Sequence, residues 1–199
     1  MSRLVYLHGF LSSPASSKVG ALREALPGVL PGCRLEAPDL NVSPAGVEAL
    51  LTSLFPGQDP ADPILGVVGS SFGGFYAARL VARLGVPLVL LNPCVDPWTR
   101  LPEWIGVRTV YGTDRRIEVK PSYEGELLEL ERTVSAYAPD VRRTLVVLSR
   151  ADEVLDWRQA ARRYASCRQL ILPAEDHRIS GFSRIIPSIL AFIKAAGAL

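Results

Sequence analysis

The amino-acid sequence predicts an α/β protein whose mostly parallel sheet of about six strands carries helices on both faces. Short apolar runs typical of buried strands alternate with helix-like segments along the whole chain. One such run, residues 64–69, leads through a glycine- and serine-rich turn into a segment with helical periodicity. The hydrophobic fraction of 48% is ordinary for a globular protein. We therefore expect residues 1–199 to form one domain.

Six segments are expected to be strands, because each is short, apolar and bounded by loop-forming residues. The fourth of them has Pro87 near its start, which suits the end of a strand better than its middle. In chain order the expected strands are residues 4–7, 34–37, 64–69, 86–91, 144–149 and 169–172.

Helices are expected between these strands. Beyond the turn at residues 69–73, Ala77, Leu80, Val81 and Leu84 recur at the spacing of one helix face. Gly85 is suited to end that helix, and Pro27 with Gly28 should end the first helix at residue 26. The other expected helices are residues 18–26, 44–54, 157–164 and 183–195.

Residues 92–140 depart from this alternation. Only one helix is expected in them, over residues 124–137, with Leu127, Leu130, Val134 and Tyr137 on one face. The segment is too long for a simple connection and too short for a separate domain. We expect a lid-like excursion over one edge of the sheet.

The charge distribution makes nucleic acid an unexpected partner. The formal net charge is +2, and acidic and basic residues are interspersed along the chain. A membrane span is not expected either, since the longest uncharged run, residues 63–78, is short and rich in glycine and serine.

A cytoplasmic location is expected. The apolar run near the N-terminus, residues 4–7, is too short for the core of a signal peptide. The three cysteines, Cys33, Cys94 and Cys167, are odd in number and widely spaced, which indicates reduced thiols.

Residues 69–73 read Gly-Ser-Ser-Phe-Gly, a match to the G-x-S-x-G motif of a nucleophilic serine. Gly/Ser-rich turns are common, so the motif gains weight from the strand before it and the helix after it. The spacing selects Ser71, because Ser70 would need glycines at positions 68 and 72. A phosphate-binding loop fits poorly, since no Lys-Ser or Lys-Thr follows and the glycines do not match G-x-G-x-x-G.

A serine hydroxyl needs a base, and the chain contains two histidines. His177 follows the last expected strand and fits the chain order of serine, acid and histidine found on this kind of sheet. His8 precedes Ser71, so we expect it to have a structural role in orienting the loop after the first strand. A surface-loop histidine is the alternative for His177, and Ser71 is what favours the catalytic interpretation.

The base in turn needs a carboxylate that holds it. Asp152 comes directly after the strand at 144–149, where ligands and catalytic groups gather on parallel sheets. Asp156 is better placed to cap the following helix, and Asp96 is a lesser alternative after the fourth strand. Asp176 adjoins His177, and neighbouring side chains seldom reach one another. We expect Asp152 to be the partner.

An oxyanion needs two backbone donors. We expect the N–H groups of Phe72, directly after the nucleophile, and of Phe10, in the loop after the first strand. An apolar acyl pocket is expected around these two residues and Leu11, Trp98 and Trp104. Packing of the excursion onto the sheet is an equally good explanation for both tryptophans.

With these motifs in sequence order, the chain resembles the compact α/β-hydrolases, and specifically the small bacterial YqiA-like esterases. The resemblance spans nearly the full length and is carried by residues 6–14, 69–74, 92–93, 152–156 and 176–177. It implies hydrolysis of carboxylic esters, with short-chain acyl groups expected, or of thioesters such as acyl-CoA. The substrate would be a small molecule, and no metal or organic cofactor is expected.

Two other classes of protein are alternatives to an ester hydrolase. An acyltransferase or a peptidase would use the same three side chains. A non-catalytic binding protein on this fold would have no use for Ser71, Asp152 and His177 together, which disfavours it.

Overall fold

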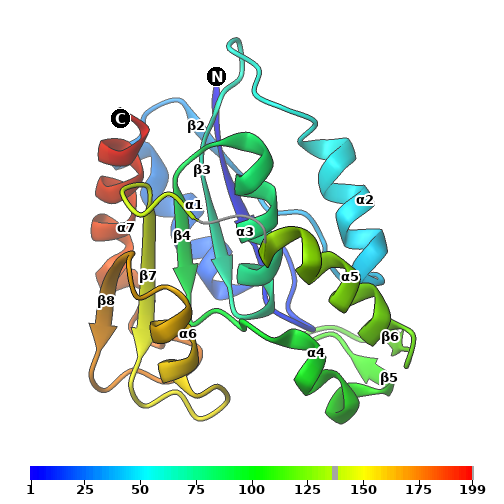
Figure 1. The fold of residues 1–199 in the computed structure, drawn as a ribbon. Helices are drawn as coiled ribbons and strands as arrows, with labels where there is room; N and C mark the ends of the chain where they lie inside the picture. The colour runs from blue at the N-terminus through cyan, green and yellow to red at the C-terminus, as the bar shows by residue number, and fades with distance from the viewer. Residues whose placement is uncertain (136–138, 199) are drawn as a thin grey trace.

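A computed structural model of the protein describes residues 1–135 and 139–198. Its centre is a six-stranded parallel sheet with the strand order β2-β1-β3-β4-β7-β8 (Figure 1). The predicted α/β class and the six predicted strands are therefore confirmed. The strands are β1 (Ser2–Leu7), β2 (Cys33–Glu36), β3 (Ile64–Ser70), β4 (Leu88–Leu91), β7 (Thr144–Ser149) and β8 (Arg168–Leu172).

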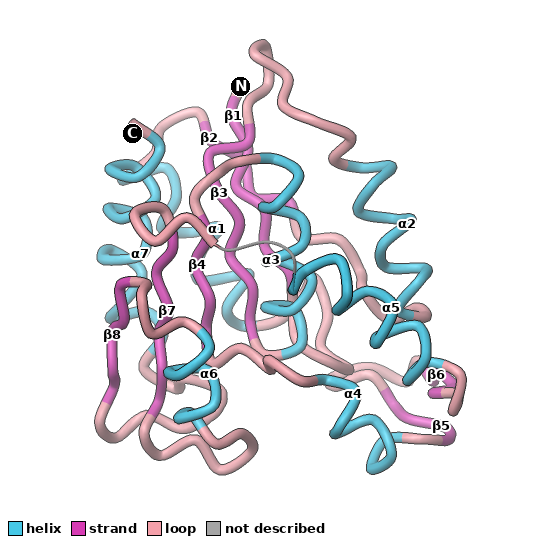
Figure 2. Tube along the Cα trace, in the orientation of Figure 1, coloured by secondary structure: helices cyan, strands magenta, loops and turns pink. Residues whose placement is uncertain are grey.

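Helices cover both faces of the sheet, as Figures 1 and 2 show. One apolar core joins the sheet to α1 and α7, and a second joins it to α2, α3 and α6. The central strands are buried on both faces, which is why they read as continuous apolar runs. The helices are α1 (Ser17–Val29), α2 (Pro44–Leu54), α3 (Phe72–Leu84), α6 (Trp157–Arg163) and α7 (Phe182–Gly197).

The prediction that the first helix ends before Pro27 is wrong, because α1 continues to Val29. Proline removes one backbone donor, and at this position the loss falls in the last turn of the helix. The Leu30 N–H still donates to the Leu26 carbonyl at 2.8 Å. The buried side chains of Leu22 and Leu26 hold this part of the helix against the sheet.

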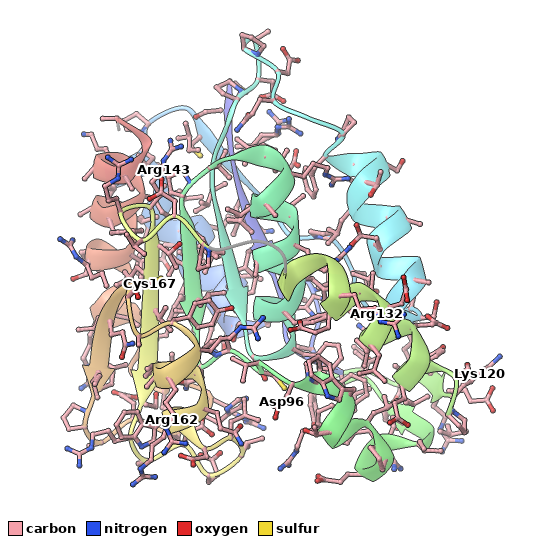
Figure 3. All side chains as sticks on the ribbon, in the orientation of Figure 1. Asp96, Lys120, Arg132, Arg143, Arg162 and Cys167 are labelled. Atoms are coloured by element: carbon pink, nitrogen blue, oxygen red, sulfur yellow. The ribbon has the colours of Figure 1, made fainter. Side chains whose placement is uncertain are left out.

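A single arginine joins the ends of two helices to the start of β7. The Arg143 guanidinium, labelled in Figure 3, donates to the carbonyl oxygen of Gly85 at 2.7 Å and to that of Ala196 at 3.1 Å. Gly85 ends α3, and Ala196 lies in the last turn of α7. Carbonyl groups at helix ends lack intrahelical donors, so this contact satisfies two of them.

Residues 92–140 contain more structure than the sequence predicted. The elements are α4 (Pro97–Arg100), a 3-10 turn (Leu101–Trp104), an antiparallel hairpin of β5 (Gly106–Thr109) and β6 (Arg116–Val119), and α5 (Tyr123–Ser135). In Figure 1 they lie together at the lower right, with α5 next to α2, and α5 packs against α2, α3 and α4. α5 corresponds to the predicted helix over 124–137, of which Tyr137 and the Val134 side chain lie outside the described residues. Movement of the segment as a lid stays a prediction.

Of the helices in the described part of the chain, none has the length and apolar character that crossing a membrane requires.

Candidate active site

Ser71 stands between β3 and α3 in a strained backbone conformation. Its φ of 52° and ψ of −121° are rarely adopted by residues other than glycine. Three hydrogen bonds hold it there: the Ser71 N–H donates to Leu91 at 2.9 Å, and the Ser71 carbonyl accepts from Gly74 at 2.9 Å and Cys94 at 3.0 Å. The sharp turn lifts the hydroxyl group off the end of the strand.

The turn requires glycine on both sides. A Cβ atom on Gly73 would overlap the carbonyl oxygen of Leu7 and lie 2.5 Å from that of His8. A Cβ on Gly69 would lie 2.5 Å from the Ala77 Cβ and 2.7 Å from the Gly73 carbonyl oxygen. These neighbours are mostly backbone atoms, which cannot turn aside as a flexible side chain would.

We expect Gly73→Ala to lower the free energy of unfolding by about 3 kcal/mol, because the added methyl group forces β1 away from α3. Urea denaturation followed by circular dichroism measures the change. Gly28→Ala is the matched control. It lies in α1 with open space around it, so alanine there should leave stability unchanged or raise it. Equal stability of Gly73→Ala and the native protein would contradict the close packing described for this turn.

The three side chains singled out in the sequence lie next to one another. His177 Nε2 is 3.0 Å from Ser71 Oγ, and His177 Nδ1 is 2.8 Å from Asp152 Oδ2. They come from loops after β3, β7 and β8, which end at the same edge of the sheet because the strands are parallel. The Asp152 side chain is 1% exposed and that of His177 is 16% exposed.

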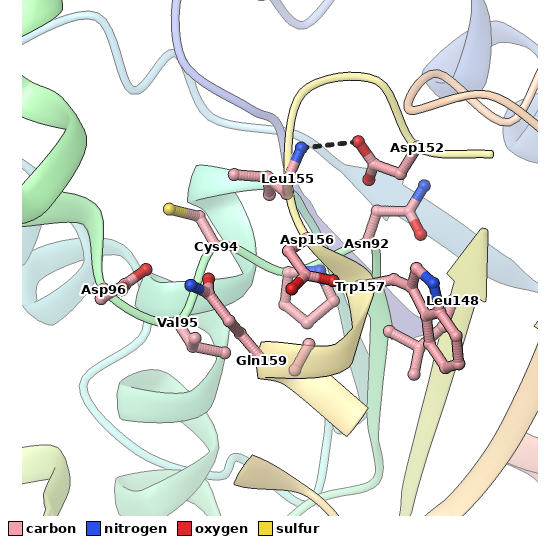
Figure 4. A pocket seen from close by; sticks show the side chains of 12 residues that line it. Asn92, Cys94, Val95, Asp96, Leu148, Asp152, Leu155, Asp156, Trp157 and Gln159 are labelled. Carbon is pink, nitrogen blue, oxygen red and sulfur yellow. Dashed lines mark hydrogen bonds between the residues drawn. The ribbon is translucent and has the colours of Figure 1, made fainter. Parts of the chain in front are cut away.

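Asp152 is held by its own loop. Its Oδ1 accepts the N–H of Val154 at 2.9 Å and the N–H of Leu155 at 2.8 Å, the latter bond being drawn in Figure 4. The other oxygen, Oδ2, is thereby left to face His177. The ring then has a defined arrangement, with Nδ1–H donating to Asp152 and Nε2 free to accept the Ser71 proton.

Asn92, directly after β4, joins the loops that carry Asp152 and His177. Its side-chain oxygen accepts the Ser149 N–H at 2.7 Å, and its amide donates to the Ser149 hydroxyl at 2.9 Å and to the His177 carbonyl at 3.0 Å. Asn92 is 3% exposed, and its φ of 42° is one that asparagine tolerates. The sequence predicted no role for it, although residues 92–93 are among those that carry the resemblance. The signal in the sequence that could have identified Asn92 is its position, as a polar residue directly after β4, a strand that is buried throughout.

The competing carboxylates are engaged elsewhere or lack contact with the ring. Asp156 caps α6 by accepting the Arg158 N–H at 3.1 Å. Asp176 accepts both the N–H and the hydroxyl of Ser180 at 2.8 Å, and these hydrogen bonds lower the pKa of its carboxyl. Asp96 precedes α4 and lines a cavity beside Asp152, where Figures 3 and 4 label it.

The two backbone donors expected to hold an oxyanion belong to Phe72, directly after Ser71, and to Phe10, in the loop after β1. The Phe72 N–H opens α3, at the positive end of the helix dipole. Phe10 follows Gly9, whose Cα faces Ser71 so closely that a Cβ there would lie 3.2 Å from the Ser71 Cβ. Within the described part of the chain, neither N–H group donates a hydrogen bond. Both are therefore available to a bound group.

His8 has no hydrogen bond to Ser71 among those of the described residues, and it instead fixes the loop that carries Phe10. It is 2% exposed, its Nε2 accepts the Leu40 N–H at 3.0 Å, and its Nδ1 lies 2.8 Å from the Gly9 carbonyl. The ring is therefore neutral, with the proton on Nδ1. Burial lowers the pKa of His8, although the Gly9 carbonyl and nearby Asp39 act in the opposite direction.

Because the His8 ring is buried and neutral, we expect the protein to lose stability in mild acid. Because the pKa of His8 is lower in the folded protein than its ordinary value of 6.5, the unfolded chain takes up a proton first as the pH falls. The contribution of neutral His8 is thus complete above about pH 6.5 and is lost progressively below it. Thermal unfolding of the native protein and of His8→Gln between pH 7.5 and 5.5 tests this. The Tm of His8→Gln should depend less on pH than the Tm of the native protein. Identical slopes of Tm against pH for the two proteins would contradict a neutral, buried His8.

Two cavities adjoin the described site. The first has about 250 Å³ of empty space and lies beside Asp152, with Cys94 and Trp157 in its wall (Figure 4). Burial raises the pKa of Cys94 to about 12, so its thiol stays protonated at neutral pH. The second has about 450 Å³ and is lined by both Phe10 and Phe72.

The predicted apolar pocket corresponds only in part to the second cavity. Leu11 lines it together with Phe10 and Phe72, whereas Trp98 and Trp104 do not. Trp104 stacks on Phe10 with ring centroids 4.5 Å apart, and Trp98 packs edge-on against Phe75 at 6.3 Å. The geometry favours the packing explanation for both tryptophans. Their contact with a substrate stays a prediction.

Across residues 1–135 and 139–198, no group of three or more histidine, cysteine, aspartate or glutamate side chains is arranged to hold a metal ion.

Known proteins resemble this chain in sequence and in fold. The model of a family described as the uncharacterised protein family UPF0227 matches residues 3–194. Est1E from Butyrivibrio proteoclasticus, solved with bound ferulic acid, superimposes with a TM-score of 0.70 at 14% identity, covering 100% of this chain and 90% of that one. Mouse alpha/beta hydrolase domain-containing protein 10 superimposes with a TM-score of 0.67 at 16% identity, covering 97% and 90%. The esterase domain of a Rhodothermus marinus protein gives 0.63 at 19% identity, covering 98% and 86%. These likenesses show that the chain has the α/β-hydrolase fold.

Proposed function

The chain belongs to the uncharacterised protein family UPF0227, and from its α/β-hydrolase fold we propose that it is a serine hydrolase that cleaves carboxylic esters. The observation that carries the proposal is the continuous contact from Ser71 Oγ through His177 to the buried Asp152 carboxylate, at 3.0 and 2.8 Å. A serine hydroxyl, an imidazole with a defined tautomer and a buried carboxylate are the parts that nucleophilic acyl transfer needs.

In the first step Ser71 attacks the ester carbonyl while His177 Nε2 takes the hydroxyl proton. The carbonyl oxygen gains negative charge, which the N–H groups of Phe10 and Phe72 stabilise. The resulting imidazolium donates its proton to the leaving alcohol, and the acyl group stays on Ser71. Asp152 stabilises the imidazolium through its hydrogen bond to Nδ1.

In the second step a water molecule attacks the acyl-enzyme. His177 takes a proton from the water, and the tetrahedral intermediate again places its oxygen at the Phe10 and Phe72 donors. Collapse of the intermediate releases the carboxylic acid, and His177 returns the proton to Ser71. The cycle needs only groups of this chain and water.

Two of the fold's relatives support esters as the substrate class. One carries bound ferulic acid, and another is described as an esterase domain. A thioester such as acyl-CoA would undergo the same two steps, and an acyltransferase would replace the water by another acceptor.

A fluorophosphonate probe followed by mass analysis tests the proposal. We expect one adduct, on Ser71, and no adduct after heat denaturation. Turnover of p-nitrophenyl butyrate, an acyl-CoA and a peptide then separates an esterase from a thioesterase and a peptidase. A protein that forms no adduct and cleaves none of the three would be a binding protein on this fold.

A further inference from the structure

We propose that the 450 Å³ cavity beside Phe10 and Phe72 is the acyl site, and that it selects uncharged acyl groups of medium length. This inference rests on the proposed ester hydrolysis and adds the class of acyl group. It differs from the short-chain preference expected from the sequence.

The position of the cavity assigns it to the acyl group rather than to the alcohol. Phe10 and Phe72, whose N–H groups are to hold the oxyanion, both line it, as does Gly9, which faces Ser71. The leaving alcohol must lie on the other side of the carbonyl carbon, within reach of His177 Nε2, which donates its proton. Among the described residues, neither Ser71 nor any member of the His177 loop lines the cavity, and Gly9 is the lining residue that faces Ser71.

The lining excludes a charged acyl group. Its walls are largely aliphatic and aromatic, and no Asp, Glu, Lys or Arg of the described residues lies in them. The two most polar side chains are engaged: His8 binds the Leu40 N–H, and the Asn41 amide donates to Ser12 and Asp39. Tyr76 and Tyr123 also line the cavity and carry hydroxyl donors, but a carboxylate on the acyl chain would lose its hydration without gaining a cationic partner.

Residues 92–140 supply the far wall of the cavity through Leu101, Ile117, Val119 and Tyr123.

Three contacts fix this wall to the opposite loops. Arg115 pairs with Asp39, the Tyr111 N–H donates to the Leu11 carbonyl at 2.8 Å, and Glu126 accepts the Ala45 N–H at 2.8 Å. Leu11 itself lines the cavity, and Asp39 and Ala45 lie within a few residues of Leu40, Val42 and Pro44, which also line it. The wall is thus joined to the loops that it faces.

A fixed wall sets an upper limit on chain length. The 450 Å³ includes space that is open to solvent, so it is an upper limit on the volume available to an enclosed acyl chain. A chain longer than acetyl gains contact with the apolar walls, and a chain longer than the cavity meets the fixed wall, so we expect the best acyl groups to have about six to ten carbons.

The test compares two series of esters, p-nitrophenyl esters of acyl length C2 to C16 and acetates of increasingly long alcohols. Ile117, half-buried on β6, lines the cavity, and Ile117→Trp should fill it. In Ile117→Trp, we expect the ratio of kcat/KM for the octanoyl ester to kcat/KM for the acetyl ester to be about 50-fold lower than in the native protein. The alcohol series should be unchanged. Val107→Trp is the matched control, because Val107 lies on the other strand of the same hairpin and is 59% exposed.

Each outcome decides the proposal. A native preference for C2 that declines steadily with length, or an Ile117→Trp profile parallel to the native one, would overturn it. If Ile117→Trp changes kcat/KM only within the alcohol series, the cavity holds the leaving alcohol instead. If the protein cleaves no ester, the proposed function fails, and thermal stabilisation by octanoate still tests the cavity. Stabilisation of the native protein but not of Ile117→Trp supports an acyl-binding cavity, and equal behaviour of the two refutes it.

Discussion

Ser71→Ala is expected to lower kcat for ester hydrolysis by about 10⁶-fold, because it removes the hydroxyl group that is hydrogen-bonded to His177 Nε2. The Ser71 hydroxyl is the partner of His177 at 3.0 Å, and the strained turn exists to present it. The measurement is the initial rate with p-nitrophenyl butyrate, together with loss of the fluorophosphonate adduct.

Ser70→Ala is the matched control, since it removes the same hydroxyl group one residue earlier. Ser70 is the last residue of β3 and is 7% exposed. We expect this variant to keep activity within a few-fold of the native protein. A Ser71→Ala variant that retains turnover while Ser70→Ala loses it would move the nucleophile to Ser70.

Asp152→Asn is expected to lower kcat by about 10⁴-fold, because the substitution changes the tautomer of His177. Two N–H groups, of Val154 and Leu155, point at Asp152 Oδ1, so the amide oxygen of asparagine would take that position. The amide NH₂ would then face His177 Nδ1, which must accept, and the ring proton would move to Nε2. A protonated Nε2 cannot take the Ser71 proton.

The measurement is kcat and KM across pH, with thermal unfolding to show that the variant is folded. KM should change little, because Asp152 does not line the cavity proposed for the acyl group. Asp96→Asn is the matched control: it makes the same change in the other candidate carboxylate and should leave kcat within a few-fold. If Asp96→Asn shows the greater loss, the orienting carboxylate is Asp96.

The sheet was predictable because buried parallel strands leave a local signature. The run at 144–149 has four consecutive apolar residues between Thr144 and Ser149 and forms β7 with those limits, and helix α2 spans 44–54 as predicted. Pro27 was misjudged, since its effect depends on which turn of the helix it occupies and on the packing of Leu22 and Leu26. The β5–β6 hairpin was missed because each of its strands has only four residues, although Arg116–Val119 alternates polar and apolar residues.

The residues of the candidate site were predictable from the sequence, but their arrangement in space was not. Chain order and strand ends selected Ser71, Asp152 and His177, whose catalytic roles stay predictions until the variants are measured. The role of Asn92 was not predicted, because the partners of its side chain, Ser149 and His177, lie 57 and 85 residues away in the chain. The tryptophans were chosen as apolar residues near the site, and only their ring contacts show that they pack against Phe10 and Phe75.

By itself, the sequence determined the alternation of strands and helices, the turn that carries Ser71, and which histidine and carboxylate follow the later strands. These features depend on interactions between residues close together in the chain. The tertiary structure alone decided that Ser71 and His177, 106 residues apart, lie within hydrogen-bonding distance, and that a cavity opens beside Phe10 rather than around the tryptophans. Such features arise from packing between distant segments, which no local pattern records.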